Sequence, residues 1–286
     1  MDITPDEYMV VCISRSIEDG ELVAQGIATP LIAAAYLLAR ETHAPNLYFM
    51  SAIGQGICRI PAPLSLASVE SLWLDRSLTN VGFVRAIADI LPRLRPIEYF
   101  RPAQVDPYGN FNNIAIGKNF QKPRLRLPGT GGIPDLTPIF NDIYLYVPRH
   151  SRLTFVPRLD FISGLGYNLG HKQEAGLRLL VTDLGQFDFN GSNATGADLM
   201  RLLSIHPGVT ISQIESRTGF EFAISSNVQE TMPPTEREIQ LLREEIDPLG
   251  IRKLEMMSGP SRKQRIHEII LAEMKNPAFQ FNSPSD

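Results

Sequence analysis

The chain has 286 residues, of which 43% are hydrophobic and 20% are charged, a composition typical of a folded globular protein. Its 27 basic and 31 acidic residues give a formal net charge of -4, which argues against nucleic acid or an anionic membrane as a partner. The two cysteines, Cys12 and Cys58, and the lack of a leader pattern predict a cytoplasmic location, and the longest apolar run, residues 31–39, is too short to span a membrane.

The N-terminal part of the chain alternates between helix and strand patterns. Thr4 and Glu7 have the spacing of a capping box around Pro5, which predicts a first helix, and Gly20 follows as a stop. The next predicted elements are a strand over residues 22–28, an almost wholly apolar helix over 30–42 and a buried strand over 47–50. This alternation predicts the α/β class, with an open mixed or parallel sheet, helices on both faces and functional loops at the strand ends.

The middle of the chain is rich in turn-forming residues. Residues 101–110 and 128–132 contain too many glycines, prolines and asparagines to be element interiors, so both are predicted to be loops. Buried strands are predicted over residues 143–147 and 178–183, and Gly185 predicts a hairpin after the second of them.

The C-terminal part is predicted to be helical. Capping-box pairs predict two helix starts, at Thr210 with Gln213 and at Thr235 with Glu238, and Gly219 is expected to end the first of these helices. We predict one domain over residues 1–258, followed over 259–286 by an amphipathic helix and a frayed tail. The apolar face of that last helix is predicted to carry Ile266, Ile269, Ile270 and Met274.

The sequence lacks the common metal and nucleotide motifs. The histidines never fall at the close spacings of zinc or iron ligands, so no metal site is predicted, and each histidine is interpreted as a surface or cap residue. They are His43, His150, His171, His206 and His267. The sequence also lacks a phosphate-binding loop ending in Gly-Lys-Ser/Thr, a Gly-x-Ser-x-Gly elbow and, after the first strand, a Gly-x-Gly-x-x-Gly fingerprint.

Several loop motifs follow one another between about residues 5 and 250. They are Gly26-Ile27-Ala28-Thr29-Pro30, His43-Ala44-Pro45-Asn46, Gly54, residues 103–110 with Asn112, Gly129-Thr130-Gly131-Gly132, Val181-Thr182-Asp183, Thr218-Gly219-Phe220 and residues 243–248. In this order they resemble the small (β) subunit of family I CoA-transferases, the glutaconate CoA-transferase type. The resemblance implies an α/β fold, a larger homologous α-subunit as partner, and an acyl-CoA bound near their interface. Coenzyme A is then part of the substrate, and no bound cofactor is expected.

Ala52 departs from the pattern of that family. In the transferases a glutamate stands at this position, two residues before the glycine that here is Gly54. The carboxylate attacks the thioester and forms an anhydride and then an enzyme thioester, and an alanine methyl group cannot do this. Neighbouring Ser51 and Gln55 offer no carboxylate either, although Ser51 is expected to contact the substrate or CoA. Transfer through this position is therefore not expected.

Superfamily members without this glutamate resemble hydrolases or lyases of CoA thioesters. Two such groups are similar to this chain: the enzyme that cleaves a ring late in steroid degradation, and a decarboxylase of a 3-methylglutaconyl-CoA type substrate. The segment from Asp160 to Tyr167 resembles the Ser-Gly-x-Gly-Tyr segment of the steroid group. The decarboxylase group has a cysteine at the position of Ala52, whereas the nearest thiol here is Cys58. The resemblance leaves hydrolysis and decarboxylation open.

The glycine loops are the predicted catalytic and binding elements. Backbone N–H groups of Gly129, Gly131 and Gly132 can approach a thioester oxygen closely, because no Cβ intervenes, and can stabilise an oxyanion or enolate. Gly54 is expected to supply a further donor, and the backbone at Gly131 is expected to need a positive φ. Neutral polar side chains suited to orienting a carbonyl or a water are Gln104 and Asn110.

Asp106 and Cys58 each have a chemical and a structural interpretation. Asp106 is a candidate acceptor or base, but a turn residue that bonds its own loop is the favoured interpretation. Cys58 is a candidate nucleophile in a glycine-rich loop, but inert packing is again favoured. Core packing is predicted for Cys12, Trp73, Tyr99 and Phe100.

The expected function is carbon–carbon bond cleavage, by hydrolysis or decarboxylation, in the β-subunit of a heteromeric acyl-CoA enzyme. Two alternatives remain: a CoA-transferase whose carboxylate comes from another residue or from the partner, and a non-catalytic subunit that binds CoA or regulates its partner. The apolar, loop-rich residues 47–66 are predicted to need cover from the large subunit.

Overall fold

The computed structural model describes residues 2–26, 28–51, 56–139, 142–166, 177–192 and 198–275. The chain forms two compact units. Unit 1 combines Met1–Gly82 with Pro234–Asp286, and unit 2 is the segment between them, which starts at Phe83 and ends at Pro233. The single domain predicted from the sequence over residues 1–258 does not separate these two units. The predicted boundary at residue 258 stays a prediction.

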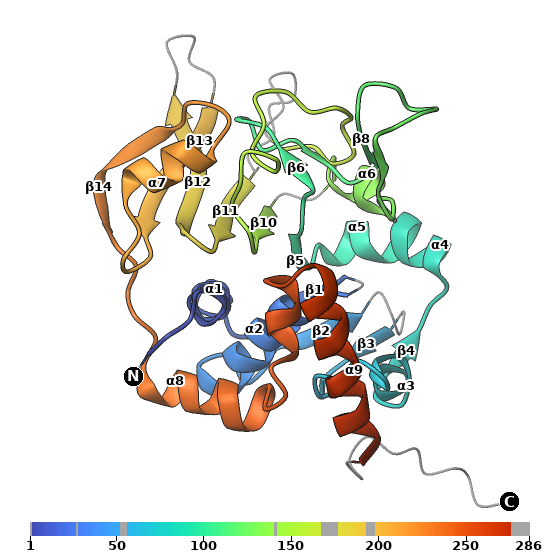
Figure 1. Cartoon of the computed structure of the whole chain (residues 1–286). Coiled ribbons are helices and arrows are strands. Elements are labelled where there is room, and N and C mark those ends of the chain that lie inside the picture. Colours follow the sequence, from blue (N-terminus) through green and yellow to red (C-terminus); the bar gives the residue numbers. More distant parts are fainter. Residues whose placement is uncertain are drawn as a thin grey trace, which may run out of the picture. The chain divides into compact units, whose positions relative to one another are not determined.

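Unit 1 is a four-stranded sheet with helices from both ends of the chain (Figure 1). The strand order is β1-β2-β3-β4. Strand β2 pairs in parallel with β1, and β3 pairs antiparallel with both β2 and β4. Its elements are α1 (Pro5–Ser14), β1 (Leu22–Gln25), α2 (Pro30–Thr42), β2 (Tyr48–Ser51), β3 (Gly56–Cys58), α3 (Val69–Leu74), β4 (Thr79–Asn80), α8 (Glu236–Gln240), η2 (Leu241–Ile246), η3 (Ile251–Glu255) and α9 (Gly259–Lys275).

The starts of the two N-terminal helices follow from local sequence. Helix α1 begins as the capping box predicts, with the Thr4 N–H donating to Glu7 Oε2 at 2.9 Å, although the helix ends at Ser14, well before Gly20. Helix α2 covers the predicted residues 30–42, and its first turn gains a further acceptor because the Leu31 N–H donates to the buried Glu255 carboxylate at 2.9 Å. Both helices bury most of their length, as apolar sequences require.

A buried arginine ties the N-terminal helix to the segment after η2. Arg252 is 1% exposed and forms ion pairs with Asp6 at 2.8 Å, Glu7 at 3.0 Å and Asp247 at 2.8 Å. Burial by itself raises the pKa of Glu7, but hydrogen bonds from Arg243 and Thr4 and the charge of Arg252 lower it to about 2. The cluster therefore holds a charged carboxylate inside unit 1, which is stable only while the arginines remain.

Helix α9 is held by a carboxylate as well as by apolar residues. Of the predicted apolar face, Ile269 is buried, but Met274 is 64% exposed, so that part of the prediction is wrong. Glu273 is buried instead and accepts hydrogen bonds from the N–H groups of Leu66 and Ala67, at 2.8 and 2.7 Å. The predicted helix is confirmed by its bounds, whereas the predicted tail lies outside the described residues.

Unit 2 contains a six-stranded mixed sheet with two small hairpins beside it. The strand order is β14-β13-β12-β11-β10-β5; the pairs of β10 with β5 and β11 and of β13 with β14 are parallel, and the pairs of β12 are antiparallel. Its elements are α4 (Phe83–Arg85), η1 (Ala86–Ile90), α5 (Leu91–Leu94), β5 (Ile97–Phe100), β6 (Gln104–Val105), β7 (Phe111–Asn112), β8 (Ala115–Ile116), β9 (Leu125–Arg126), α6 (Ile133–Leu136), β10 (Ile143–Val147), β11 (Leu177–Thr182), β12 (Gly185–Ser192), β13 (Asp198–Ile205), α7 (Ile211–Arg217) and β14 (Ala223–Glu230).

The mixed sheets and their helices confirm the predicted α/β class. The hairpin at Gly185 is confirmed, since β11 and β12 are antiparallel, and both C-terminal capping boxes form. Gly219 lies beyond the end of α7 and lets the backbone approach the Phe155 carbonyl, which accepts its N–H at 2.9 Å. Among the described residues, none of the helices has the length and apolar character needed to cross a membrane.

Two buried histidines correct the surface interpretation made for them. His150 and His206 are each 3% exposed. His150 contacts the hydroxyls of Thr182 and Thr218 and stacks on Phe155 with centroids 3.8 Å apart. By contrast His43 ends α2 as a cap residue, which confirms the prediction there, and His267 is exposed, while His171 lies outside the described residues.

We expect the histidine at position 206 to make unit 2 sensitive to acid. Burial lowers its pKa from 6.5 to about 4, against the opposing hydrogen bond to Thr182. The unfolded chain therefore binds the proton more readily than the folded chain. The free energy of unfolding is unaffected by protonation of this residue above pH 6.5 and decreases as the pH falls from 6.5 toward 4. Urea unfolding at several pH values should show wild type losing about 1.4 kcal/mol per pH unit more than His206→Gln across this window. Equal slopes would contradict the assignment.

Candidate functional site

In unit 1 the predicted site residues lie at the end of β2 and in β3. Ser51 is the last residue of β2, is 1% exposed, and pairs in register with Gln25 of β1 and Gly56 of β3. The carboxyl ends of two parallel strands thus meet here, the usual position of a site in an open α/β sheet. Ala52 and Gly54 lie outside the described residues, so their predicted roles rest on the sequence.

Cys58 lies in an apolar environment. It is 0% exposed, and its Sγ is 3.8 Å from both the Trp73 carbonyl and the Ser77 Oγ. Burial raises the pKa of the thiol, so the thiolate that a nucleophile requires is disfavoured. These features support packing rather than catalysis. The predicted core positions Cys12, Trp73, Tyr99 and Phe100 are all buried, which confirms them.

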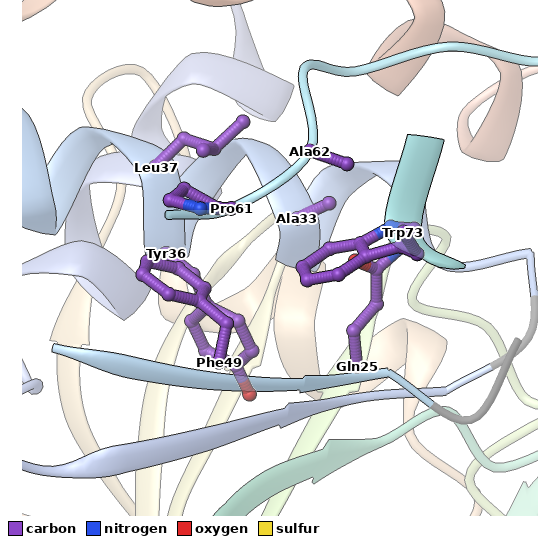
Figure 2. Close-up of a pocket in the computed structure, with 8 residues that line it drawn as sticks. All are labelled: Gln25, Ala33, Tyr36, Leu37, Phe49, Pro61, Ala62 and Trp73. Atoms are coloured by element: carbon purple, nitrogen blue, oxygen red, sulfur yellow. The ribbon is translucent and has the colours of Figure 1, made fainter. Parts of the chain in front are cut away.

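A small cavity lies in the same unit and is shown in Figure 2. Its volume is about 10 Å³, about the minimum for one water molecule and far too little for an acyl-CoA. In the figure the Trp73 ring lies over the Gln25 side chain, while the rings of Tyr36 and Phe49 overlap in the view below Pro61. The cavity is therefore a packing gap, lined by Gln25, Ala33, Tyr36, Leu37, Phe49, Pro61, Ala62 and Trp73.

In unit 2 Asp106 organises the turn that follows β6. Its Oδ1 accepts the N–H groups of Tyr108 and Asn110, at 2.9 and 3.0 Å, and its Oδ2 accepts the Asn110 side chain at 3.1 Å. Burial raises the pKa of Asp106, while these donors oppose the shift. Both oxygens are thus occupied by the turn itself, as the structural interpretation expects.

Gln104 belongs to a buried polar network. Its Oε1 accepts from the Asn112 side chain at 2.8 Å and from the Asp160 N–H at 3.2 Å, and its Nε2 donates to Asp160 Oδ2 at 3.1 Å. The same Asp160 oxygen accepts the Gly117 N–H at 2.9 Å. The amide of Gln104 therefore joins β6 to β7 and to the loop that contains Asp160, and the role of Asp160 in this network was not predicted from the sequence.

The segment that resembles the steroid-ring group packs directly on this turn. Gly166 donates its N–H to Asn110 Oδ1 at 3.1 Å, and a Cβ at Gly166 would collide with the backbone of Tyr108 and Gly109. Gly164 approaches Phe111 just as closely, since a Cβ there would meet the phenylalanine ring. Glycine is required at both places because backbone or ring atoms fill the space of a side chain. The structure thus brings residues 104–113 and 160–166 together.

The glycine loop of residues 129–132 has the backbone that the sequence predicts at Gly131. Gly129 and Gly131 have positive φ of 113° and 53°, and a Cβ at either would point into open space. Gly132 has a negative φ, but its Cβ would collide with Ile87 of η1. Within the described residues no hydrogen bond uses the N–H of Gly131 or Gly132. Both donors are therefore available to an external acceptor.

The comparisons with known proteins define the class of protein. The family model described as Coenzyme A transferase matches residues 7–216, so the chain belongs to this family, as predicted. It is 35% identical over 256 residues to the cholesterol ring-cleaving hydrolase IpdB subunit of Mycobacterium tuberculosis, covering 87% of this chain and 96% of that one. It is 31% identical over 261 residues to one subunit of the 3-oxoadipate CoA-transferase of Pseudomonas knackmussii, covering 83% of this chain and 91% of that one.

A solved structure gives the same picture. The crystal structure of the decarboxylase AibA/AibB matches with a TM-score of 0.74 and 33% identity, over 88% of this chain and 98% of that one. The relatives thus include a transferase, a hydrolase and a decarboxylase, so the family does not by itself select the reaction. Among the described residues, no group of three or more histidine, cysteine, aspartate or glutamate side chains is arranged to hold a metal ion.

Proposed function

We propose that this chain is the small subunit of a two-subunit enzyme that breaks a carbon–carbon bond in an acyl-CoA thioester. The observation that carries the proposal is Ala52, an alanine at the position where the transferases of this family have their glutamate. Without that carboxylate no anhydride forms, and no enzyme thioester can hold CoA while it is transferred from one acid to another. The similarity to a hydrolase subunit and to a decarboxylase supports the same choice.

The glycine loop supplies the stabilisation that either cleavage requires. In hydrolysis, hydroxide adds to a ketone beside the bond, the bond breaks, and its electron pair moves to the carbon next to the thioester. In decarboxylation the bond to the carboxylate breaks and carbon dioxide leaves. The electron pair of that bond is delocalised toward the thioester carbonyl. Both routes give an enolate, and a proton then returns to carbon. We infer that the N–H groups of Gly131 and Gly132, which no hydrogen bond uses among the described residues, donate to the enolate oxygen.

The polar residues of the loop cluster act as positioning residues in this proposal. Gln104 and Asn110 use their side-chain atoms to join residues 104–113 to residues 160–166, and Asp106 holds the turn that carries Asn110. We infer that they rigidify the loops they join, because a network with all its partners satisfied restricts the motion of its surroundings. Direct contact of the substrate with Gln104, Asp106 or Asn110 stays a prediction. Contact of the substrate with Ser51 or Gly54 stays a prediction as well.

We expect Cys58→Ser to keep turnover within a few-fold of wild type, because the thiol is packed and protonated rather than reactive. Steady-state kinetics on the heteromer with its acyl-CoA substrate provide the measurement. Cys12→Ser is the matched control, since Cys12 is a second buried thiol whose pKa burial raises to about 12. A loss of activity confined to the Cys58 variant would move the mechanism to a nucleophilic thiol.

The partner in the proposal is a larger homologous subunit. The hydrolase and transferase relatives are subunits of larger enzymes, and the solved decarboxylase is a complex of two components. The described part of residues 47–66 is largely buried within unit 1, although Tyr48 is 40% and Ile60 62% exposed, so the predicted need for cover is wrong for most of this segment. Unit 2 exposes apolar side chains at several places, among them the helical segment 83–94, where Phe83 is 51% and Val84 78% exposed.

Product analysis tests the proposed reaction. The heteromer, made with the large subunit, is incubated with acyl-CoA thioesters that carry a ketone or a carboxylate near the thioester, and the products are identified by mass spectrometry. The proposal expects a shortened or ring-opened acyl-CoA with CoA still attached. Release of an unchanged acid, with CoA moved to a second acid, would favour transfer, and no product from any thioester would favour a non-catalytic subunit.

A further inference from the structure

The hairpin of β8 and β9 carries an unusual concentration of positive charge. Between residues 115 and 126 it contains Lys118, Lys122, Arg124 and Arg126, and no aspartate or glutamate occurs from residue 107 to residue 134. The whole chain, by contrast, has a formal net charge of -4. All four cationic residues are exposed. This hairpin is therefore a local positive patch on an acidic protein.

These cations are not neutralised by carboxylates of the unit. Among the described residues no ion pair or hydrogen bond joins Lys118, Lys122 or Arg124 to a carboxylate. Arg126 makes its hydrogen bond to a backbone acceptor, the Phe120 carbonyl at 2.7 Å. Cations that have no internal partner keep their charge free for an external anion.

The hairpin is also held in shape. Gly117 has a φ of 110°, and its N–H donates to the buried network through Asp160 Oδ2. The Asn119 side chain accepts the N–H groups of Gln121 and Lys122, at 2.9 and 3.2 Å, which closes the loop as a turn. A preorganised loop loses less entropy on binding than a disordered one.

Phe120 adds an exposed aromatic ring to the patch. The ring is 54% exposed, Arg126 lies over it with Cζ 4.4 Å from the centroid, and Phe161 packs against it edge-on at 5.6 Å. The ring is thus fixed by an arginine and a second ring while much of its surface stays accessible. An aromatic ring beside cations is the arrangement that binds a nucleotide, with the base stacked and the phosphates paired.

We propose that the β8–β9 hairpin binds the 3′-phospho-ADP portion of coenzyme A, with the lysines and Arg124 at its phosphates and Phe120 at its adenine. The proposal rests on the proposed function and identifies where that substrate is held. Arg126 is five residues before Gly131, a span of at most roughly 17 Å of extended chain. The pantetheine arm separates the phosphates of CoA from the thioester, so one substrate can reach both the hairpin and the glycine loop.

Binding measurements on the assembled heteromer test this assignment. Isothermal titration with CoA, 3′-dephospho-CoA and pantetheine compares wild type with the triple variant Lys118→Ala/Lys122→Ala/Arg124→Ala. The expected result is a dissociation constant for CoA raised about 10- to 100-fold, a smaller rise for 3′-dephospho-CoA, and no change for pantetheine, which has no phosphate. The single variant Phe120→Leu should weaken both nucleotides about tenfold.

A charge-matched control removes three exposed cations elsewhere: Arg237→Ala/Lys263→Ala/Lys275→Ala should bind CoA as wild type does. Unchanged CoA binding by the hairpin triple variant would overturn the assignment while leaving the proposed function intact. So would an equal loss for pantetheine, or a variant that no longer assembles with the large subunit, which would make the hairpin a subunit contact. Wild-type heteromer that binds none of the three probes would overturn both proposals.

Discussion

Replacing Gly131 by alanine is expected to lower turnover of the heteromer by about 10²- to 10³-fold, with assembly unchanged. Gly131 has a φ of 53°, and the left-handed conformation costs a residue with a Cβ about 1–2 kcal/mol, so the loop relaxes and turns its N–H groups away. The new methyl group also enters the open space in which the substrate is proposed to lie. Loss of one donor to a developing oxyanion typically has an effect of this size.

Gly208→Ala is the matched control for backbone strain. Gly208 is in the same unit, has a φ of 78°, and a Cβ there also meets nothing within 4 Å. It should lose some stability and keep normal turnover, because it lies outside the glycine loop. Equal losses of turnover in the two variants, or normal turnover in Gly131→Ala, would contradict the donor role. Steady-state kinetics on one acyl-CoA substrate and size-exclusion chromatography provide both readouts.

Replacing Arg252 by methionine should lower the free energy of unfolding by about 3–5 kcal/mol, the largest stability effect expected in unit 1. Methionine fills much of the space but leaves the carboxylates of Asp6, Glu7 and Asp247 buried without their shared cation. Urea unfolding at pH 7 provides the measurement. The deficit should narrow as the pH falls, because protonation of the Glu7 and Asp247 carboxyl groups removes uncompensated charge.

The control for this variant is Arg237→Met. Its ion pair with Glu245, at 3.6 Å, is exposed on both sides, so the loss should be about 0–1 kcal/mol. If the two variants lose the same amount of stability, the buried cluster does not have the importance assigned to it. A deficit of Arg252→Met that stays constant down to pH 4 would likewise show that unpaired charge is not its cause.

The starts of helices were predictable because they depend on neighbours in the sequence. The boxes of Thr4 with Glu7, Thr210 with Gln213 and Thr235 with Glu238 all form. Strand ends were less predictable, since pairing with another strand sets them: β1 ends at Gln25 rather than at residue 28. Local patterns therefore gave the order of elements more reliably than their limits.

Polar burial was not predictable, because the partners are distant in sequence. His150 lies 32 and 68 residues from the two threonines that satisfy its ring, and Gln104 lies 56 residues from Asp160. Likewise Glu273 anchors α9 through N–H groups more than 200 residues away, so the helix buries a carboxylate where an apolar face was expected. Periodicity describes one element at a time and contains no information on such pairs.

The glycine loop was predictable to a greater extent. Glycine permits a positive φ and leaves the backbone donors uncovered, which predicts such a φ at Gly131, and the structure has it. The contact of Gly132 with Ile87 gives a second reason for glycine that the sequence did not reveal. The same residues thus serve both packing and the proposed chemistry, and mutagenesis must separate the two roles.

An exchange experiment on the wild-type heteromer distinguishes carbon–carbon bond cleavage from CoA transfer most directly. Acyl-CoA substrate is incubated with isotopically labelled acetate, and the protein is then treated with borohydride or hydroxylamine and its peptides are analysed by mass spectrometry. We expect cleavage of the acyl group with no labelled acetyl-CoA and no modified carboxylate in this subunit, because Ala52 offers none. Labelled acetyl-CoA, together with a trapped aspartyl or glutamyl peptide from this chain, would contradict this expectation and make the protein a transferase.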